Sequence, residues 1–379
     1  MLYLIDLESY KERYTYWWKD YIPSEFFKYN LEFEIIEGGQ LTKTVDVGTV
    51  LDAAGTNYYK SIQLQKICEL FKANRIKDND HFLIADIWFP GIEMIRYMAN
   101  LYHKKVYIWG IWHAGSITMG DFAQIMNPWS KYFEYGFINM CDGVFVGSEY
   151  SKNSILERLT VDFKMTEEEY KSLSKKIHAY GMPLDYNYLQ KFNNVEKENI
   201  IIFPHRPDEE KGINEFLNLI EYLFMKWDKV FDYTFLFTTS KLKYKSQSEI
   251  INNRLSFLQS NTNLNNNIII KENLDKEEYY SLLGKSKFMI STSLEENFGY
   301  VAVEALALGC HVLVPNNFSY PELVEGDKNC LYDTLEELAD KIKHFNKNEI
   351  INRNIFLNYA EPYNRVVHKW IGIMMGVIT

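Results

Sequence analysis

Two glutamates at a fixed spacing are the residues of this chain best suited to chemistry. They lie in the segment SLEENFGYVAVEALALGC, where Glu296 and Glu304 stand on either side of Gly299. An apolar strand precedes the segment, and its spacing predicts a helix that begins near Gly299. A carboxylate accepts paired hydrogen bonds from vicinal hydroxyls, so both glutamates suit a polyol such as a hexose or a ribose.

The start of the predicted helix is also a candidate anion site. Its first backbone N–H groups have no partner within the helix, so they can hold a diphosphate, and Gly299 lets a ligand approach closely. Two plainer interpretations compete with this one. Glu296 can act as a charge at the helix N-terminus, and Glu304 can lie on a solvated helix face. The second is weak, because the apolar neighbours of Glu304 predict burial, and a buried glutamate needs a partner.

A pair of cations follows an earlier strand, in the segment IIIFPHRPDEEKGINEFL. Arg206 closes the strand, and Lys211 comes five residues later, directly before Gly212 and an amphipathic helix. Two cations at this place would neutralise a pyrophosphate as it leaves. Two ordinary surface cations are the alternative, which we rank lower because the glutamate pair lies in the same half of the chain.

The first half of the chain offers single residues at the ends of predicted strands. His113 follows an apolar strand and precedes Ala114 and Gly115, and Asp86 ends another strand. Ligands of parallel α/β sheets bind outside the carboxyl ends of the strands, so both residues are candidate ligand contacts. Asp86 is a candidate contact to an acceptor substrate, the molecule that would receive a transferred group. A structural histidine is the alternative for His113. Ser148 is a candidate helix cap as much as a candidate site residue.

The segment RYTYWWKDYIP combines aromatic rings with cations. Rings stack on sugars or bases and cations meet phosphates, so the segment is a candidate contact to an acceptor. The residues concerned are Arg13, Tyr14, Trp17, Trp18 and Lys19. An amphipathic helix with buried aromatic residues explains the segment equally well.

The elements that must position these residues alternate between short apolar strands and helices. Strands are predicted over 1–7, 31–38, 81–89, 105–115, 143–149, 177–183, 199–206, 233–240, 266–273, 287–293 and 310–316. Helical periodicity fills most of the intervals, which predicts parallel sheets with helices on both faces. The pattern restarts after a polar segment, 183–199, which we interpret as a linker. We therefore predict two doubly wound α/β domains with a cleft between them.

Composition narrows the function classes. The chain has 379 residues and a net charge of −10, with a pI of about 5.4, so no global basic field holds a polyanion. The four cysteines are scattered, which is typical of a reducing compartment. The N-terminus does not resemble a signal peptide, and no apolar run is long enough to span a membrane. We expect a cytoplasmic protein.

The glutamate segment resembles the Glu-x7-Glu motif of retaining GT-B glycosyltransferases (group 1, family 4-like). That motif runs Ser-x-x-Glu-Gly-Phe-Gly, then Glu-Ala-x-Ala-x-Gly, an apolar strand and a Pro-Glu pair. The chain follows it through Glu322, with Asn297 in place of a common glycine. The segment with Arg206 and Lys211 is similar to the family's Gly-Arg-x4-Lys-Gly segment, with His205 in place of the glycine.

The resemblance implies a domain organisation and a role for each matching residue. It implies an N-terminal acceptor-side domain over 1–184, a nucleotide-sugar domain over 185–355 and a last helix over 356–379 that crosses back. Catalytic roles fall on His113, Glu296, Arg206 and Lys211: His113 and Glu296 would contact the donor sugar, and the two cations its phosphates. Donor-binding roles fall on Asn297, Phe298, Gly299, Tyr300, Val301 and Glu304, the last of which would hold the ribose.

The implied activity is transfer of a hexose or pentose from a nucleotide sugar, most simply a UDP-sugar, to a hydroxyl with retention of configuration. No cofactor or metal is required. Residues Asp78–Asp80 match the Asp-x-Asp pattern of a metal-binding motif, but this stretch is predicted to be a turn. Several N-terminal segments also look like those of phage-encoded enzymes, which makes a hydroxymethylated pyrimidine in DNA a candidate acceptor. The alternatives are a surface polysaccharide, lipid or protein acceptor and, in another class, a non-catalytic nucleotide-sugar-binding protein.

Overall fold

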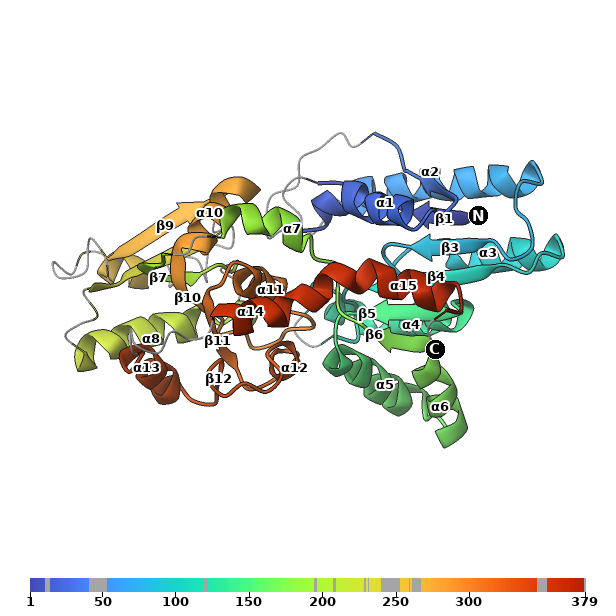
Figure 1. Ribbon diagram of the computed structural model, residues 1–379. Coiled ribbons are helices and arrows are strands. Elements are labelled where there is room, and N and C mark those ends of the chain that lie inside the picture. Colours follow the sequence, from blue (N-terminus) through green and yellow to red (C-terminus); the bar gives the residue numbers. More distant parts are fainter. Residues whose placement is uncertain are drawn as a thin grey trace. The chain divides into compact units, whose positions relative to one another are not determined.

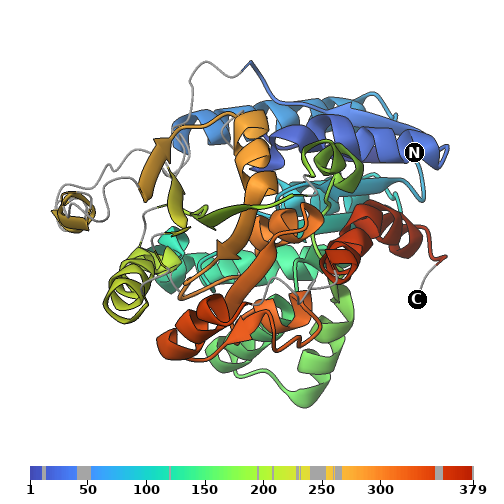
Figure 2. The same cartoon turned by 60° about the vertical axis from the view of Figure 1, so that its left-hand side comes forward.

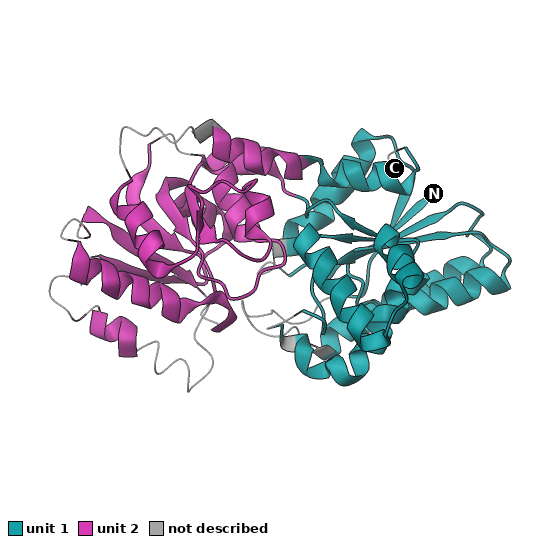
Figure 3. Ribbon diagram, turned by 90° about the horizontal axis from the view of Figure 1, so that it is seen from below, with its two compact units in different colours: residues 1–183, 365–379 teal, residues 184–364 magenta. Residues whose placement is uncertain are grey.

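The chain divides into two compact units, each described here by itself. Unit 1 comprises Met1–Pro183 and Arg365–Thr379, and unit 2 comprises Leu184–Asn364 (Figure 3). The computed structural model describes residues 1–10, 14–40, 53–118, 121–193, 196–206, 209–227, 230, 232–239, 253–258, 260, 267–345 and 353–377.

Each unit is built on a sheet of six parallel strands with helices on both faces (Figures 1 and 2). The strand order is β2-β1-β3-β4-β5-β6 in unit 1 and β12-β11-β10-β7-β8-β9 in unit 2. The order reverses between β1 and β3 in unit 1, and between β7 and β10 in unit 2. Such switch points open a crevice at the carboxyl ends of the two strands, where ligands of this class of sheet bind.

The elements of unit 1 follow the predicted alternation. Its strands are β1 (Leu2–Ile5), β2 (Phe33–Ile36), β3 (His81–Ile84), β4 (Tyr107–Trp112), β5 (Gly143–Val146) and β6 (Ile177–Ala179). Its helices are η1 (Tyr14–Trp17), α1 (Trp18–Lys28), α2 (Ala53–Lys72), α3 (Ile92–Leu101), η2 (Phe122–Met126), α4 (Asn127–Met140), α5 (Glu149–Phe163), α6 (Glu167–Lys176) and α15 (Val366–Met374).

Unit 2 repeats the alternation with shorter connections. Its strands are β7 (Glu198–Phe203), β8 (Thr234–Thr239), β9 (Ile268–Glu272), β10 (Ser286–Ile290), β11 (His311–Pro315) and β12 (Leu331–Tyr332). Its helices are α7 (Tyr186–Leu189), η3 (Gln190–Phe192), η4 (Glu209–Lys211), α8 (Ile213–Lys226), α10 (Lys276–Lys285), α11 (Tyr300–Ala307), α12 (Tyr320–Leu323), α13 (Leu335–Lys343), α14 (Arg353–Ala360) and η6 (Glu361–Arg365).

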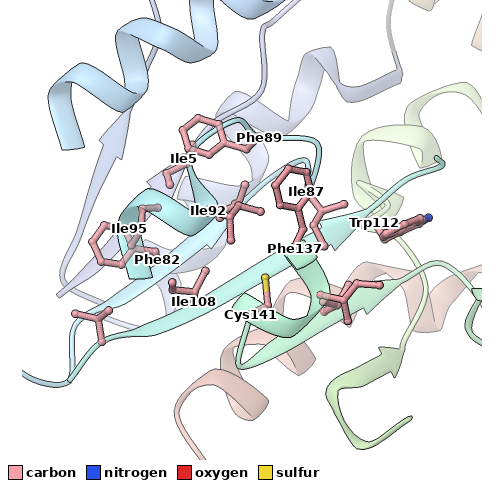
Figure 4. Close-up of a cluster of buried hydrophobic side chains, with 14 of the residues drawn as sticks. Ile5, Phe82, Ile87, Phe89, Ile92, Ile95, Ile108, Trp112, Phe137 and Cys141 are labelled. Atoms are coloured by element: carbon pink, nitrogen blue, oxygen red, sulfur yellow. The ribbon is translucent and has the colours of Figure 1, made fainter. Parts of the chain in front are cut away.

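One face of the unit 1 sheet carries a continuous apolar core. Alternate residues of the strands, such as Tyr3 and Ile5 of β1, point into it because successive side chains of a strand face opposite ways. Figure 4 shows this packing where the sheet meets α3 and α4, with Phe82, Ile95 and Phe137 among the buried side chains. The strands of unit 1 are therefore buried on this face by helices, as the apolar runs predicted.

Helix α15 belongs to unit 1 although it lies at the end of the chain. Its Trp370 is fully buried, with its ring 6.2 Å from Trp18 of α1 and 5.3 Å from Phe145 of β5, centroid to centroid. The expected change of domain at 355/356 lies nine residues before the observed one, because α14 packs against α11 and stays within unit 2.

The predicted strands all occur, and the two doubly wound parallel sheets are confirmed. Two local differences stand out. The short edge strand β12 was not predicted, because two residues carry no periodicity. The polar segment 183–199, interpreted as a linker, contains α7 and η3, whose Leu189 is buried. Among the residues that the structure describes, no helix is long and apolar enough to cross a membrane.

Truncation of Trp370 tests how strongly α15 holds unit 1 together. Trp370→Ala leaves a large cavity between α1 and β5, so we expect a loss of about 3 to 5 kcal/mol in the free energy of unfolding. Denaturant titration followed by near-ultraviolet circular dichroism measures it. Val377→Ala, at a residue that is 80% exposed, is the control and should change little. Equal stabilities of the two variants would show that α15 contributes nothing to unit 1.

Candidate active site

The switch point of unit 2 brings together the two segments singled out in the sequence. Lys211 follows β7 and Glu296 follows β10, and these strands are neighbours in the sheet. The Lys211 ammonium lies 3.2 Å from Oε2 of Glu296, and both side chains are 17% exposed. A lysine and a glutamate far apart in the sequence thus form one partly buried ion pair at the place where α/β sheets bind ligands.

Backbone contacts fix the distance between these two loops. The hydroxyl of Thr292 donates a hydrogen bond of 2.6 Å to the carbonyl of Gly212. Gly212 has φ +66°, and a Cβ there would lie 1.9 Å from the Thr292 carbonyl oxygen. Only glycine fits, so the position of Lys211 relative to the β10 loop depends on Gly212.

Glu296 also accepts a backbone hydrogen bond at the N-terminus of α11. Its Oε1 accepts a hydrogen bond of 3.1 Å from the backbone N–H of Gly299, the residue that precedes the helix at φ +85°. Burial would raise the pKa of Glu296, but the Lys211 charge and these hydrogen bonds outweigh it and hold the pKa below its usual value. Glu296 is therefore an anion that binds both Lys211 and the helix N-terminus, which is one of the two interpretations left open above.

The residues around Gly299 divide between packing and the helix start. Phe298 is buried, with its ring 4.9 Å from Tyr300 and 5.1 Å from Tyr363, so its side chain belongs to the core. Asn297, Tyr300 and Val301 are half-buried. The donor-binding roles expected for this stretch stay predictions.

Glu304 is buried, and its partners are two tyrosines of α10. The hydroxyl of Tyr280 donates to Oε1 at 2.9 Å, and that of Tyr279 donates to Oε2 at 3.2 Å. The solvated-face interpretation of Glu304 is wrong, since the side chain is 4% exposed. The partner that a buried glutamate requires is thus a pair of neutral donors, which the sequence analysis did not identify.

Arg206 lies at the same edge of the sheet but in a separate ion pair. Its guanidinium lies 2.6 Å from Oε1 of Glu210, and its side chain is 38% exposed. Lys211 and Glu296 form one pair, and Arg206 and Glu210 form another. Both cations that we expected to meet a diphosphate are therefore compensated by carboxylates within unit 2.

His205 is a buried residue of the site that sequence reasoning noted only as a substitution. Its ring is 6% exposed, and its Nε2 has no hydrogen-bond partner among the described residues. Burial, reinforced by the Lys211 charge, lowers the pKa of His205 to about 3, so the imidazole is neutral near pH 7. The signal in the sequence was its place between an apolar strand and Arg206.

In unit 1 the switch point carries a second partly buried ion pair. The Lys60 ammonium of α2 lies 2.7 Å from Oδ2 of Asp86 and donates to the Trp88 carbonyl at 2.6 Å. Burial would raise the pKa of Asp86, but the Lys60 charge overcomes it and the pKa lies below the usual value. Asp86, the expected acceptor contact, is thus engaged by Lys60, which the sequence analysis missed because α2 gave no sign of which residue faces the site.

His113 lies beside this pair at the end of β4. Its Nε2–H donates a hydrogen bond of 2.7 Å to the Ala85 carbonyl, and its ring centroid is 5.2 Å from that of Trp18. Burial lowers the pKa of His113, and the nearby Asp86 charge offsets only part of this effect. The ring is therefore neutral with its proton on Nε2, which leaves Nδ1 as the nitrogen that can accept a hydrogen bond.

A buried glutamate of α4 holds the loop that follows His113. Glu134 accepts hydrogen bonds from the backbone N–H of Ser116 at 2.5 Å and from its hydroxyl at 2.7 Å. A Cβ at Gly115 would lie 2.3 Å from Glu134 Oε1, so the small residues after His113 serve this close approach. Burial raises the pKa of Glu134.

The aromatic segment near the N-terminus only partly fits its expected role. Trp18 is 1% exposed and packs on His113 and Trp370, so for this residue the structure favours the buried-aromatic alternative. Trp17 is half-buried against Tyr21. Arg13 and the side chain of Tyr14 lie outside the described residues.

Two further expectations concern local structure. Ser148 is the N-cap of α5, and its hydroxyl accepts a hydrogen bond of 3.0 Å from the Ser151 N–H, which confirms the predicted cap. Asp80 accepts from the Lys77 N–H and pairs with the N-terminal amine, within a turn. In the part of the chain that the structure describes, no three acidic, histidine or cysteine side chains are placed to hold a metal ion.

Similarity to solved structures defines the class of fold. An α,α-trehalose 6-phosphate synthase from Burkholderia multivorans superposes with a TM-score of 0.62 at 11% identity, covering 87% of this chain and 76% of that one. The pneumococcal O-GlcNAc transferase GtfA, in complex with UDP and GlcNAc, gives 0.56 at 16% identity, covering 84% and 60%. The chain has the GT-B fold, as the sequence implied.

Sequence comparison gives the family resemblance independent support. Residues 186–362, nearly all of unit 2, match the model of the family described as glycosyl transferases group 1. The chain is also 25% identical over 252 residues to a Drosophila melanogaster protein named tRNA-queuosine alpha-mannosyltransferase. That match covers 61% of this chain and 63% of the relative, so it spans less than two thirds of the relative's length. The family match supports the resemblance of unit 2 to group 1 glycosyltransferases.

The neutral state of His205 predicts a specific acid sensitivity. Its pKa is about 3 when folded and 6.5 as the ordinary value, so the folded chain binds fewer protons between these limits. The contribution of neutral His205 to the free energy of unfolding is therefore fully present above pH 6.5, and it is lost as the pH falls toward 3. For His205→Gln, we expect the decrease in unfolding free energy from pH 7 to pH 5 to be smaller by about 2 kcal/mol.

Denaturant titration at several pH values measures this difference. The other buried histidines titrate in both proteins and cancel in the comparison. His344→Gln, at an exposed histidine of the same unit, is the control and should keep the wild-type slope. Parallel curves for wild type and His205→Gln would mean that His205 is not held neutral by the fold.

Proposed function

We propose that this chain is a retaining glycosyltransferase that moves a sugar from a nucleotide sugar to a hydroxyl. The observation that carries the proposal is the Lys211–Glu296 pair at the switch point of unit 2, beside the start of α11. A cation, a carboxylate and a helix N-terminus there supply what a sugar diphosphate needs: charge for its phosphates and acceptors for its hydroxyls.

The leaving diphosphate is the part of the donor that most needs the protein. As the bond between the sugar C1 and the phosphate oxygen breaks, negative charge grows on that oxygen. Lys211 would exchange part of its contact with Glu296 for this charge, and Arg206 would do the same with Glu210. The N–H groups at the start of α11 would add their dipoles. These groups act more strongly on the departing diphosphate than on the intact donor, which is how binding becomes catalysis.

The new bond forms between the acceptor oxygen and C1 on the face from which the diphosphate departs. The acceptor proton passes to a phosphate oxygen of the leaving group, so atoms and charge balance without a protein nucleophile. Retention follows from this front-face geometry, which the resemblance to the Glu-x7-Glu family implies. Glu296 would accept hydrogen bonds from the donor sugar, and the role of His113 as a donor contact rests on the resemblance alone.

A UDP-sugar is the proposed donor. Two structures with the same fold support it: the pneumococcal transferase is in complex with UDP and GlcNAc, and an E. coli trehalose-6-phosphate structure is bound with UDP-2-fluoro glucose. Glu304 would hold the ribose, since its carboxylate lies on the same short helix whose start would bind the phosphates.

For the acceptor we propose a hydroxyl on a modified base of a nucleic acid. The Drosophila relative is named for action on the queuosine of tRNA, which supports this class. A hydroxymethylated pyrimidine in phage DNA is a second candidate acceptor of the same class. With a net charge of −10, the chain would have to meet such an acceptor through local cations. A polysaccharide, lipid or protein acceptor and a non-catalytic binding protein are the competing outcomes.

Substitution of the two glutamates separates their roles. Glu296→Ala should lower turnover about a hundredfold with little change in donor KM, because its contact is to the reacting sugar. Glu304→Ala should raise the donor KM about tenfold. Release of nucleoside diphosphate from UDP-, GDP- and ADP-sugars gives both constants. Glu278→Ala, at a surface glutamate of α10, is the control. Unchanged kinetics in both variants would refute the site.

The acceptor is tested by transfer of labelled sugar. Wild-type protein is incubated with labelled donor and either total tRNA, hydroxymethylated DNA or unmodified DNA. We expect label in at least one modified nucleic acid and none in unmodified DNA, with an α-linked product by NMR if configuration is retained from an α-linked donor. Labelling of polysaccharide, lipid or protein alone would refute the nucleic-acid acceptor. Failure to release diphosphate with any donor or acceptor would refute the transferase.

A further inference from the structure

Both oxygens of the Glu304 carboxylate are held by consecutive residues of one helix. Tyr280 donates to Oε1 at 2.9 Å and Tyr279 donates to Oε2 at 3.2 Å. The two rings lie 5.2 Å apart, and the Lys276 ammonium lies 5.4 Å from the centroid of each. Both oxygens of the carboxylate thus accept hydrogen bonds, which fixes its plane as well as its position.

The two tyrosine hydroxyls are the only hydrogen-bond partners of the Glu304 carboxylate among the described residues. No cation pairs with its carboxylate among the described residues, although the side chain is 4% exposed. Burial and the Glu304 charge together raise the pKa of both phenols well above 10, so each stays a hydrogen-bond donor over the whole accessible pH range. The Glu304 carboxylate therefore depends on these hydroxyls for its orientation at any working pH.

The two hydrogen bonds are unequal in their exposure. Tyr280 is 4% exposed and its bond to Oε1 is buried, whereas Tyr279 is half-buried and its bond to Oε2 lies nearer solvent. A carboxylate oxygen can accept two hydrogen bonds, so each oxygen of Glu304 keeps capacity for a ligand hydroxyl. The inner bond sets the direction of the carboxylate, and the outer oxygen is the one that a ligand reaches first.

We propose that Tyr279 and Tyr280 position the Glu304 carboxylate so that the nucleotide site selects a ribose over a 2′-deoxyribose. This proposal rests on the proposed function, in which Glu304 meets the ribose of the donor. The tyrosines act through Glu304 and are positioning residues. A carboxylate with a fixed plane accepts from a ribose hydroxyl at a fixed angle, and a site built for that hydroxyl rejects a ligand that lacks it.

A purely structural role for the tyrosines makes a different prediction. If they only satisfied a buried charge, their loss would loosen the helix and weaken every nucleotide by the same factor. If they orient the carboxylate, their loss weakens ribonucleotides and leaves deoxyribonucleotides nearly unchanged. The ratio of the two dissociation constants separates these cases, because a general loss of structure cancels in it.

The experiment is calorimetric titration of the full chain with UDP, GDP and ADP and with their 2′-deoxy counterparts. Wild type should prefer the ribonucleotide by about tenfold or more. Tyr280→Phe should reduce that preference about tenfold, and Tyr279→Phe about threefold, because its bond is the more exposed one. The deoxyribonucleotide constants should change less than about twofold. Tyr188→Phe, whose hydroxyl meets Glu277 at the surface, is the control and should behave as wild type.

Each other outcome has a distinct meaning. Equal weakening of both nucleotide types, or an unchanged ratio in both phenylalanine variants, would overturn the positioning role and leave the transferase proposal intact. Equal affinity of wild type for both types would overturn the ribose selectivity itself. If wild type bound none of the six nucleotides, both this inference and the proposed function would be wrong. Should Tyr280→Phe fold poorly by its melting temperature, the half-buried Tyr279→Phe decides.

Discussion

The ion pair between Lys211 and Glu296 is the interaction on which the candidate donor site depends. It ties the loop after β7 to the loop after β10, and the same glutamate closes the start of α11 through the Gly299 N–H. One carboxylate therefore connects two strands and a helix at the switch point of the sheet. Because the pair is partly buried, removal of either partner would leave a charge without compensation, which is far more costly than loss of a surface pair.

The same design recurs in unit 1 with different residues. Lys60 and Asp86 form a partly buried pair beside the switch between β1 and β3, with neutral His113 next to it. In each unit a lysine and a carboxylate meet at the carboxyl edge of a parallel sheet and the neighbouring histidine is kept neutral, by burial above all. In each pair the two charges compensate each other at the edge of the sheet.

The glutamate segment of unit 2 was largely predictable from the sequence, and the contacts around Asp86 and Trp18 in unit 1 were not. Glu296, Gly299 and Glu304 lie within one strand, loop and helix, so their local spacing already places them together. Lys60 meets Asp86 from a different helix, and Trp18 is buried by Trp370 from the other end of the chain. The hydrophobic periodicity of one helix or strand does not indicate contacts with distant residues, so the roles of Lys60 and Trp18 could not be assigned from the sequence. Likewise, the apolar neighbours of Glu304 indicated a buried partner, but Tyr279 and Tyr280 become that partner only when α10 and α11 are folded.

The sequence by itself determined the alternation of strands and helices, the two parallel sheets and the residues that follow each strand. It could do so because apolar periodicity and glycine positions are local properties that the backbone must obey. Only the tertiary structure decided which charges pair, which histidines are neutral and which aromatic rings are buried. The physical reason is that ion pairing, pKa and burial depend on atoms that the order of strands brings close together. That order cannot be predicted from any single segment of the sequence.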